Sequence, residues 1–100
     1  MPEESDHLCR EVTIINKLGL HARSAAKIAA IARQTKYPVW LSNGEEEVDA
    51  KSIMDILILN RPKGSRLMIR VENDTAHDVL SDILQLVRDG FGELNENDRQ

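Results

Sequence analysis

The chain has a single cysteine, Cys9, and only three aromatic residues, Tyr37, Trp40 and Phe91. One cysteine cannot form an internal disulfide or supply a cysteine-based zinc site. So few aromatic side chains argue against a surface that stacks nucleic-acid bases, as RRM and OB domains do. Disulfide scaffolds, cysteine-ligated zinc domains and base-stacking domains are therefore disfavoured.

Long hydrophobic runs and blocks of like charge are also missing. No apolar stretch approaches the roughly 20 residues of a membrane-spanning helix, and residues 1–9 are too polar and acidic for a signal peptide. The net charge of −4 comes mostly from the two ends of the chain, and no run of like charge resembles a nucleic-acid-binding tail. We therefore expect a cytoplasmic protein that neither inserts into membranes nor binds nucleic acid.

The 100 residues, 41% of them hydrophobic and 30% charged, suit one compact domain. Such a chain buries one modest core and leaves no room for an enclosed substrate cavity. We expect an acidic N-terminal tail over 1–9, a folded domain over 10–92 and a polar C-terminal tail over 93–100. The chemistry of such a module is expected on its surface.

Hydrophobic periodicity predicts strands and helices in the order β-α-β-β-α-β-α. The predicted strands cover 10–16, 39–42, 47–48 and 67–71. The predicted helices cover 22–33, 53–59 and a last segment that begins at Asp74 or Thr75 and stops at Gly90. This order predicts an α+β fold, an open-faced β-sandwich whose four-stranded antiparallel sheet is covered on one face by three helices.

Two short motifs mark boundaries within this pattern. Asn43-Gly44 tolerates the positive φ angles of a tight turn and predicts a hairpin between the second and third strands. Ser52 precedes a short apolar helix, and Asp55 follows three residues later. That arrangement is typical of a helix N-cap with an acidic first turn.

The segment Gly19-Leu20-His21-Ala22-Arg23-Ser24 joins the first strand to the first helix. His21 is predicted at or just before the N-cap, where the amides of Ala22 and Arg23 lack helical partners and the dipole favours negative charge. The Arg23 guanidinium has a planar fork that suits phosphoryl oxygens. Because imidazole is a good nucleophile at neutral pH, this segment favours a transferable phosphoryl group on His21.

A plainer interpretation of His21 is that it only caps the helix or lies on the surface. The other histidines, His7 and His77, fall in the N-terminal tail and in the first turn of the last helix. Three histidines scattered in this way do not predict a metal site.

Residues 19–25 resemble the active-site signature of HPr, the histidine-containing phosphocarrier of the bacterial sugar phosphotransferase system. Lys51-Ser52-Ile53-Met54 is similar to the regulatory serine segment of the same family. The spacing of the two segments, the Asn43-Gly44 hairpin and the order of elements agree with this resemblance. It covers roughly residues 10–90.

The resemblance implies that His21 accepts a phosphoryl group from enzyme I, which phosphoenolpyruvate charges, and passes it to an enzyme IIA domain. It further implies a pros-phosphohistidine steadied by the Arg23 side chain and by the backbone amides of Ala22, Arg23 and Ser24. The family needs no metal or organic cofactor of its own. The protein would then be a covalent carrier rather than a free-standing enzyme.

The same resemblance makes Ser52 the residue that HPr kinase/phosphorylase modifies. The surface shared by successive partners would consist of Leu20, Ile53, Met54 and Leu57. We expect the protein to act as a monomer.

Two positions depart from the family pattern. Ser24 stands where the family commonly has proline, and Asp55 stands where it commonly has glycine. Ser24 keeps a backbone amide that could donate to the phosphate or bind water, whereas Asp55 disfavours a phosphate on Ser52 through like-charge repulsion. These departures leave an alternative open, an HPr-like regulatory module that signals phosphorylation state to a regulator or a metabolic enzyme. Retention of His21 and Arg23 favours the carrier.

Overall fold

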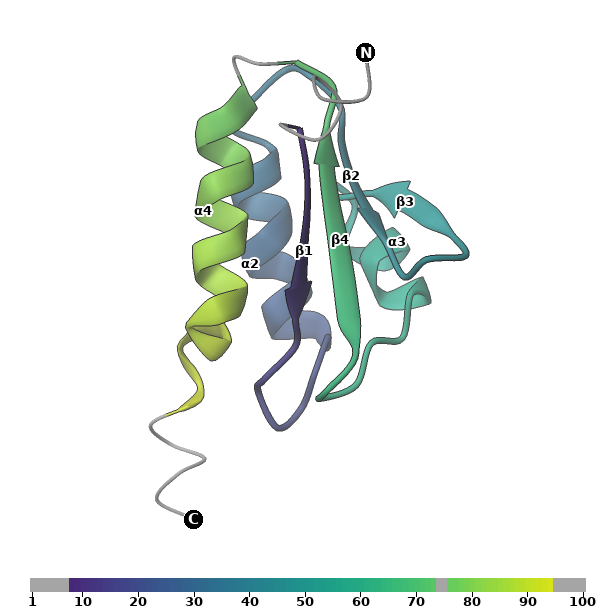
Figure 1. Ribbon diagram of the computed structural model, residues 1–100, viewed down its shortest axis with the longest axis vertical. Coiled ribbons are helices and arrows are strands. Elements are labelled where there is room, and N and C mark those ends of the chain that lie inside the picture. Colours follow the sequence, from purple (N-terminus) through teal and green to yellow (C-terminus); the bar gives the residue numbers. More distant parts are fainter. Residues whose placement is uncertain (1–7, 74–75, 95–100) are drawn as a thin grey trace.

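The computed structural model describes residues 8–73 and 76–94, which form a four-stranded sheet with helices packed on one face (Figure 1). In chain order the elements are β1 (Cys9–Thr13), α2 (Ala22–Ala32), β2 (Val39–Ser42), β3 (Glu47–Asp49), α3 (Ile53–Ile58), β4 (Arg66–Val71), α4 (His77–Arg88) and the 3-10 turn η2 (Gly90–Gly92). The predicted βαββαβα order and α+β class are confirmed.

The strands lie in the order β1-β4-β2-β3, and every neighbouring pair is antiparallel. The first strand therefore lies beside the last one, in a register that pairs Val12 with Leu67. This pairing continues into the loops, where the Gly64 amide donates to the carbonyl of Ile14 at 2.7 Å and the Leu20 amide donates to the carbonyl of Arg61 at 2.9 Å. The loops that follow β1 and precede β4 thus meet at one end of the sheet.

The core lies between the sheet and the helices. In β4, Leu67, Ile69 and Val71 are buried under the helices, while the intervening side chains lie on the open face. The stripe predicted on the first helix is buried as expected, and it consists of Ala25, Ile28, Ala29 and Ala32. Small alanine side chains allow α2 to pack close to the sheet. The last helix buries Val79, Leu80, Ile83, Leu84 and Val87.

The ends of several elements differ from the predicted ones. The first strand stops at Thr13 and not at Asn16, because the Asn16 amide group turns inward and donates to the carbonyl of Gly19. Cys9, predicted in the tail, is the first residue of β1. The predicted capping residues of the last helix, Asp74 and Thr75, lie outside the described residues.

The open face of the sheet carries a cluster around Arg70. Its guanidinium lies 5.7 Å from the centre of the Trp40 ring and donates to both carboxylate oxygens of Glu47, at 2.8 and 2.9 Å. Hydrogen bonding to Arg70 holds the pKa of the Glu47 carboxyl below its ordinary value. Trp40 in turn donates its indole N–H to Glu72 at 2.8 Å. These contacts join the edge strand β3 to the two central strands.

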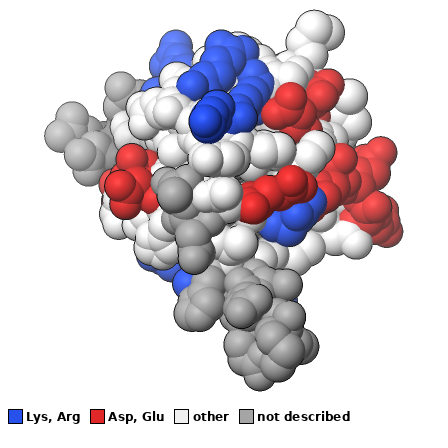
Figure 2. All heavy atoms as spheres, turned by 90° about the horizontal axis from the view of Figure 1, so that it is seen from above, with Lys and Arg blue, Asp and Glu red and all other residues white. Residues whose placement is uncertain are grey.

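Figure 2 looks onto the end of the molecule at which β4 stops and α4 starts. There, Lys and Arg side chains gather in one area and most of the visible Asp and Glu side chains gather in another. The loops after β1 and before β4 lie at the opposite end (Figure 1).

Gly19 fixes how closely those two loops approach. Its φ angle is +66°, and a Cβ atom built there would lie 2.4 Å from the carbonyl oxygen of Arg61 and 2.9 Å from the Cα of Pro62. Both neighbours are backbone atoms and cannot rotate away. Only glycine therefore fits between the start of α2 and the loop that follows α3.

We predict that Gly19→Ala lowers the free energy of unfolding by about 2–4 kcal/mol, because left-handed strain and overpacking add at this position. Gly64→Ala is the matched control. Gly64 also has a positive φ, +91°, but a Cβ atom added to it would have no other atom within 4 Å, so only the strain of about 1–2 kcal/mol applies. Urea denaturation of both variants measures the difference. Equal losses of unfolding free energy in the two variants would show that the contact with Arg61 does not constrain residue 19.

Candidate functional site

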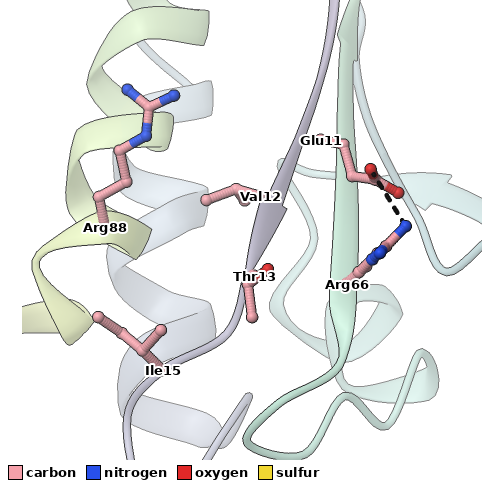
Figure 3. Close-up of a pocket in the computed structure, with 6 residues that line it drawn as sticks. All are labelled: Glu11, Val12, Thr13, Ile15, Arg66 and Arg88. Carbon is pink, nitrogen blue, oxygen red and sulfur yellow. Dashed lines mark ion pairs between the residues drawn. The ribbon is translucent and has the colours of Figure 1, made fainter.

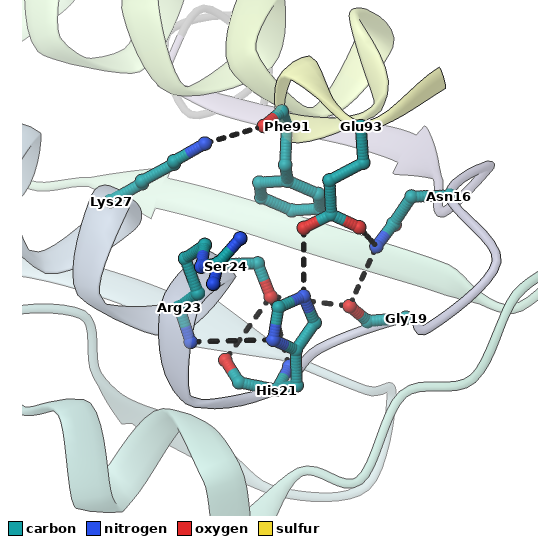
Figure 4. A network of polar contacts seen from close by, with 8 residues as sticks. All are labelled: Asn16, Gly19, His21, Arg23, Ser24, Lys27, Phe91 and Glu93. Atoms are coloured by element: carbon teal, nitrogen blue, oxygen red, sulfur yellow. Dashed lines mark hydrogen bonds and ion pairs between the residues drawn. The ribbon is translucent and has the colours of Figure 1, made fainter. Parts of the chain in front are cut away.

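His21 is the N-cap residue of α2, as the sequence predicts. Its backbone is extended, with φ −139° and ψ −178°, and its carbonyl accepts the first helical hydrogen bond, from the amide of Ala25 at 2.8 Å. An extended N-cap directs its side chain back over the first turn of the helix. The imidazole therefore lies against the helix N-terminus, where it meets the neighbours drawn in Figure 4.

The two ring nitrogens of His21 meet partners of opposite kind. Nδ1 lies 3.3 Å from the backbone nitrogen of Arg23, which is a donor. Nε2 lies 2.7 Å from Oε2 of Glu93, which is an acceptor. In a neutral imidazole one nitrogen carries the proton and the other a lone pair. These partners therefore assign the proton to Nε2 and the lone pair to Nδ1.

Ser24 closes the first turn of the helix through its side chain. Its Oγ accepts from the His21 amide at 2.9 Å, and its hydroxyl has the carbonyls of Gly19 and His21 as acceptors, both at 3.1 Å. Together with the His21 ring, this forms a reciprocal capping box. The sequence suggested a role only for the Ser24 amide, whereas its buried side chain fixes the backbone on which His21 stands.

Arg23 lies on the exposed first turn of α2, next to the imidazole (Figure 4). Among the residues that the structure describes, no carboxylate or carbonyl binds its guanidinium. Its backbone amide is the donor to His21 Nδ1. The side chain is therefore able to turn toward an anion bound at that nitrogen.

Glu93 completes the site, whereas the sequence pattern predicts it in a polar C-terminal tail over 93–100. The residue is only 8% exposed, and its second oxygen, Oε1, accepts from the Asn16 side chain at 2.9 Å. Asn16 also donates to the carbonyl of Gly19 at 2.9 Å. The folded unit therefore extends through Glu93, because its carboxylate is buried between two donors.

A left-handed turn carries Glu93 back to the site. Three consecutive residues after α4 have positive φ angles: Gly90 at +66°, Phe91 at +59° and Gly92 at +78°. Phe91 is fully buried, and Lys27 of α2 donates to its carbonyl at 2.7 Å. The Gly-Phe-Gly spacing directly after a helix was the sequence signal that a structured turn leads into Glu93.

The predicted partner-binding residues differ in exposure. Leu20 and Ile53 are half-buried and pack against the core, whereas Met54 is 76% and Leu57 38% exposed. Two further exposed apolar side chains were not predicted, Leu18 at 64% and Ile58 at 60%. The exposure of Ile58 could have been predicted from the sequence. The segment after Ser52 is apolar on nearly all sides apart from Asp55, and a short helix buries only one face.

Ser52 is the N-cap of α3, as predicted. Its Oγ accepts from the Asp55 amide at 3.2 Å, which leaves the Asp55 carboxylate in the first turn of the same helix. Of the other two histidines, His77 is exposed at the start of α4, and His7 lies outside the described residues.

A hollow of about 450 Å³ between β1 and α4 does not include the imidazole. It is lined by Glu11, Val12, Thr13, Ile15, Arg66 and Arg88 (Figure 3). Glu11 and Arg66 form an ion pair across it at 3.6 Å. It holds no nucleophile paired with a base. The His21 ring instead lies at the molecular surface, with 26% of its side chain exposed.

Two other kinds of site are not found in the part of the chain that the structure describes. Within residues 8–73 and 76–94, no three His, Cys, Asp or Glu side chains are arranged to hold a metal ion. None of the helices described there combines the length and apolar character of a membrane span.

The family model described as the phosphotransferase system HPr component phosphorylation site matches residues 8–89. The chain belongs to the HPr family. It is 41% identical to phosphocarrier protein HPr of Pseudomonas aeruginosa, over 83% of this chain and 93% of that protein. With HPr of Cupriavidus necator it shares 38% identity, over 86% of this chain and 97% of that protein.

Solved structures agree with this assignment. A crystal structure of HPr from Thermoanaerobacter tengcongensis superposes with a TM-score of 0.79 at 32% identity, covering 85% of this chain and 96% of that one. The predicted family and its open-faced fold are thereby confirmed.

Proposed function

We propose that His21 carries a phosphoryl group on Nδ1, which it receives from enzyme I and passes to an enzyme IIA domain in the cytoplasm. The observation that carries the proposal is the orientation of the ring. Nδ1 has the lone pair and lies at the N-terminus of α2, while Nε2 is engaged by Glu93. Phosphoenolpyruvate is the original source of the phosphoryl group, through enzyme I.

The transfer itself is a displacement at phosphorus. The Nδ1 lone pair forms the new P–N bond, and the electron pair of the broken bond leaves with the phosphorylated nitrogen of the donor. The contact between Nδ1 and the Arg23 amide is long, at 3.3 Å, so that amide is easily released from nitrogen. Its N–H then donates to a phosphoryl oxygen, where the helix dipole also favours negative charge.

The phosphoryl acceptor is tested by labelling with enzyme I and radioactive phosphoenolpyruvate. We predict an acid-labile, base-stable phosphate on the parent protein and none on His21→Ala, while His77→Ala is labelled normally. Adding an enzyme IIA domain should remove the label from the parent. A labelled His21→Ala protein would contradict the acceptor, and label that no enzyme IIA domain removes would indicate the regulatory module instead of the carrier.

Arg23 is proposed to steady the transferred phosphoryl group. Loss of a charge-assisted hydrogen bond costs about 1.5–3 kcal/mol, or roughly 10- to 150-fold in rate if the bond is made in the transition state. We predict that Arg23→Ala slows phosphoryl transfer by this factor and leaves the thermal unfolding midpoint nearly unchanged, because the side chain is exposed.

Arg33→Ala is the charge control for this prediction, and it also removes a hydrogen bond from the Arg33 guanidinium to the carbonyl of Lys51. It removes the same kind of charge at the other end of α2, about 15 Å away at 1.5 Å per residue. If Arg23→Ala transferred within twofold of the parent, or if Arg33→Ala were equally slow, Arg23 would have no specific role.

We further propose that the exposed apolar side chains Leu18, Met54, Leu57 and Ile58 contact the partner proteins, together with Leu20 and Ile53. These side chains come from α3 and from the loop before α2. The Leu20 amide donates to the carbonyl of Arg61, which joins that loop to the segment after α3. A phosphate on Ser52 would add about −1.5 to −2 charge to this surface. Ser52 is thus proposed as a control point for docking.

We predict that Ser52→Asp slows labelling of His21 by enzyme I several-fold, and that Asp55→Asn speeds it, because each changes the negative charge beside an apolar contact surface. Ser52→Ala distinguishes a regulatory role of Ser52 in docking from its role as the N-cap of α3. It should lower the free energy of unfolding by about 0.5–2 kcal/mol through loss of the cap, without slowing the labelling. Initial labelling rates at two salt concentrations measure the effect. Equal rates for Ser52→Asp and the parent would show that Ser52 acts only as a helix cap.

A further inference from the structure

We infer that Glu93 is a positioning residue for His21, which holds the ring proton on Nε2 and offsets the positive charge that the ring acquires when Nδ1 bonds phosphorus. The inference rests on the proposed function. The contact that carries it is the 2.7 Å approach of Glu93 Oε2 to His21 Nε2. The two residues are 72 positions apart in the chain, so no local requirement of the helix brings them together.

The surroundings hold the Glu93 carboxylate where the ring needs it. Its side chain is only 10% exposed, compared with 26% for His21, so water competes little for either oxygen. One oxygen accepts from Asn16 and the other faces His21. Because both neighbours are donors, the site requires two acceptors side by side, which a carboxylate provides and an amide does not.

The proton and the charges balance through this pair. When Nδ1 attacks phosphorus, the ring gives its lone pair to the new bond and becomes a cation. Its proton stays on Nε2, between that nitrogen and Glu93 Oε2. The carboxylate therefore meets a neutral ring before transfer and a positive ring afterwards, and it stabilises the second more strongly. In catalytic Asp–His pairs the carboxylate has the same two roles, because it orients the imidazole and stabilises its positive charge.

Backbone conformation supports a functional reason for the placement of Glu93. Phe91, a bulky residue, is held at φ +59° between two left-handed glycines, and such a conformation is costly for any residue with a side chain. Lys27 bonds the Phe91 carbonyl at 2.7 Å and holds the turn in place. This strained turn ends at the residue whose carboxylate faces the imidazole.

The first part of the experiment reads the ring directly, without phosphorylation. The ¹⁵N chemical shifts of His21, measured where the ring is neutral, should show a protonated Nε2 and an unprotonated Nδ1 in the parent protein. Glu93→Gln has the same size but only one acceptor oxygen, so its ring nitrogens should shift toward a mixture of the two tautomers. Glu46→Gln, the same change at an exposed residue of the β2–β3 loop, should keep the parent shifts.

The second part measures the initial rate of His21 labelling by enzyme I. Glu93→Gln should be slower than the parent by roughly 10- to 100-fold, since a charge-assisted hydrogen bond to the developing cation is lost. Glu46→Gln should be labelled like the parent. Lys27→Met loosens the turn without touching the ring and should change both readouts in the same direction as Glu93→Gln, by a smaller amount.

Parent-like tautomers or a parent-like rate in Glu93→Gln would each overturn the inference. A loss of stability accompanied by unchanged ring shifts would leave Glu93 with a structural role alone. Failure of the proposed function has a different signature, because an unlabelled parent protein would contradict the phosphorylation of His21 whatever the ¹⁵N shifts of the two proteins are.

Discussion

The pairing of β1 with β4 is the constraint on which the site depends. It brings the loop after the first strand against the loop before the last one, at the same end of the sheet as the start of α2 and the end of α4. Three stretches of the chain that are distant in sequence therefore converge there, because the loop after β1 runs directly into α2. His21 and Glu93 meet only because each is attached to an element whose position the sheet and its helices define.

The groups at this end serve folding and chemistry together. A helix N-terminus must find partners for its free amides, and here the His21 ring and the Ser24 hydroxyl supply them. The same requirement places an imidazole nitrogen where the helix favours an anion. Ser24 in place of the family's usual proline adds a buried side-chain cap, so this departure changes how the turn is held and keeps the histidine in position.

Local sequence patterns predicted most of what is local in the structure. The 3.6-residue spacing in α2, the alternation in β4 and the capping positions of His21 and Ser52 follow from neighbouring residues, and the structure confirms them. Glu93 and Asn16 were missed because their roles depend on a contact between opposite ends of the domain. Charged residues near a chain end predict a solvated tail, and only the fold shows that the Glu93 carboxylate is buried.

The close fit of Gly19 against Arg61 and Pro62 has a consequence for the docking of partners. It joins the loop that bears His21 to the segment that follows α3, so the proposed docking surface and the imidazole are held next to each other by packed backbone. A surface that is already ordered loses little conformational entropy on binding. Under the proposed function, each successive partner therefore docks on a surface that is already formed.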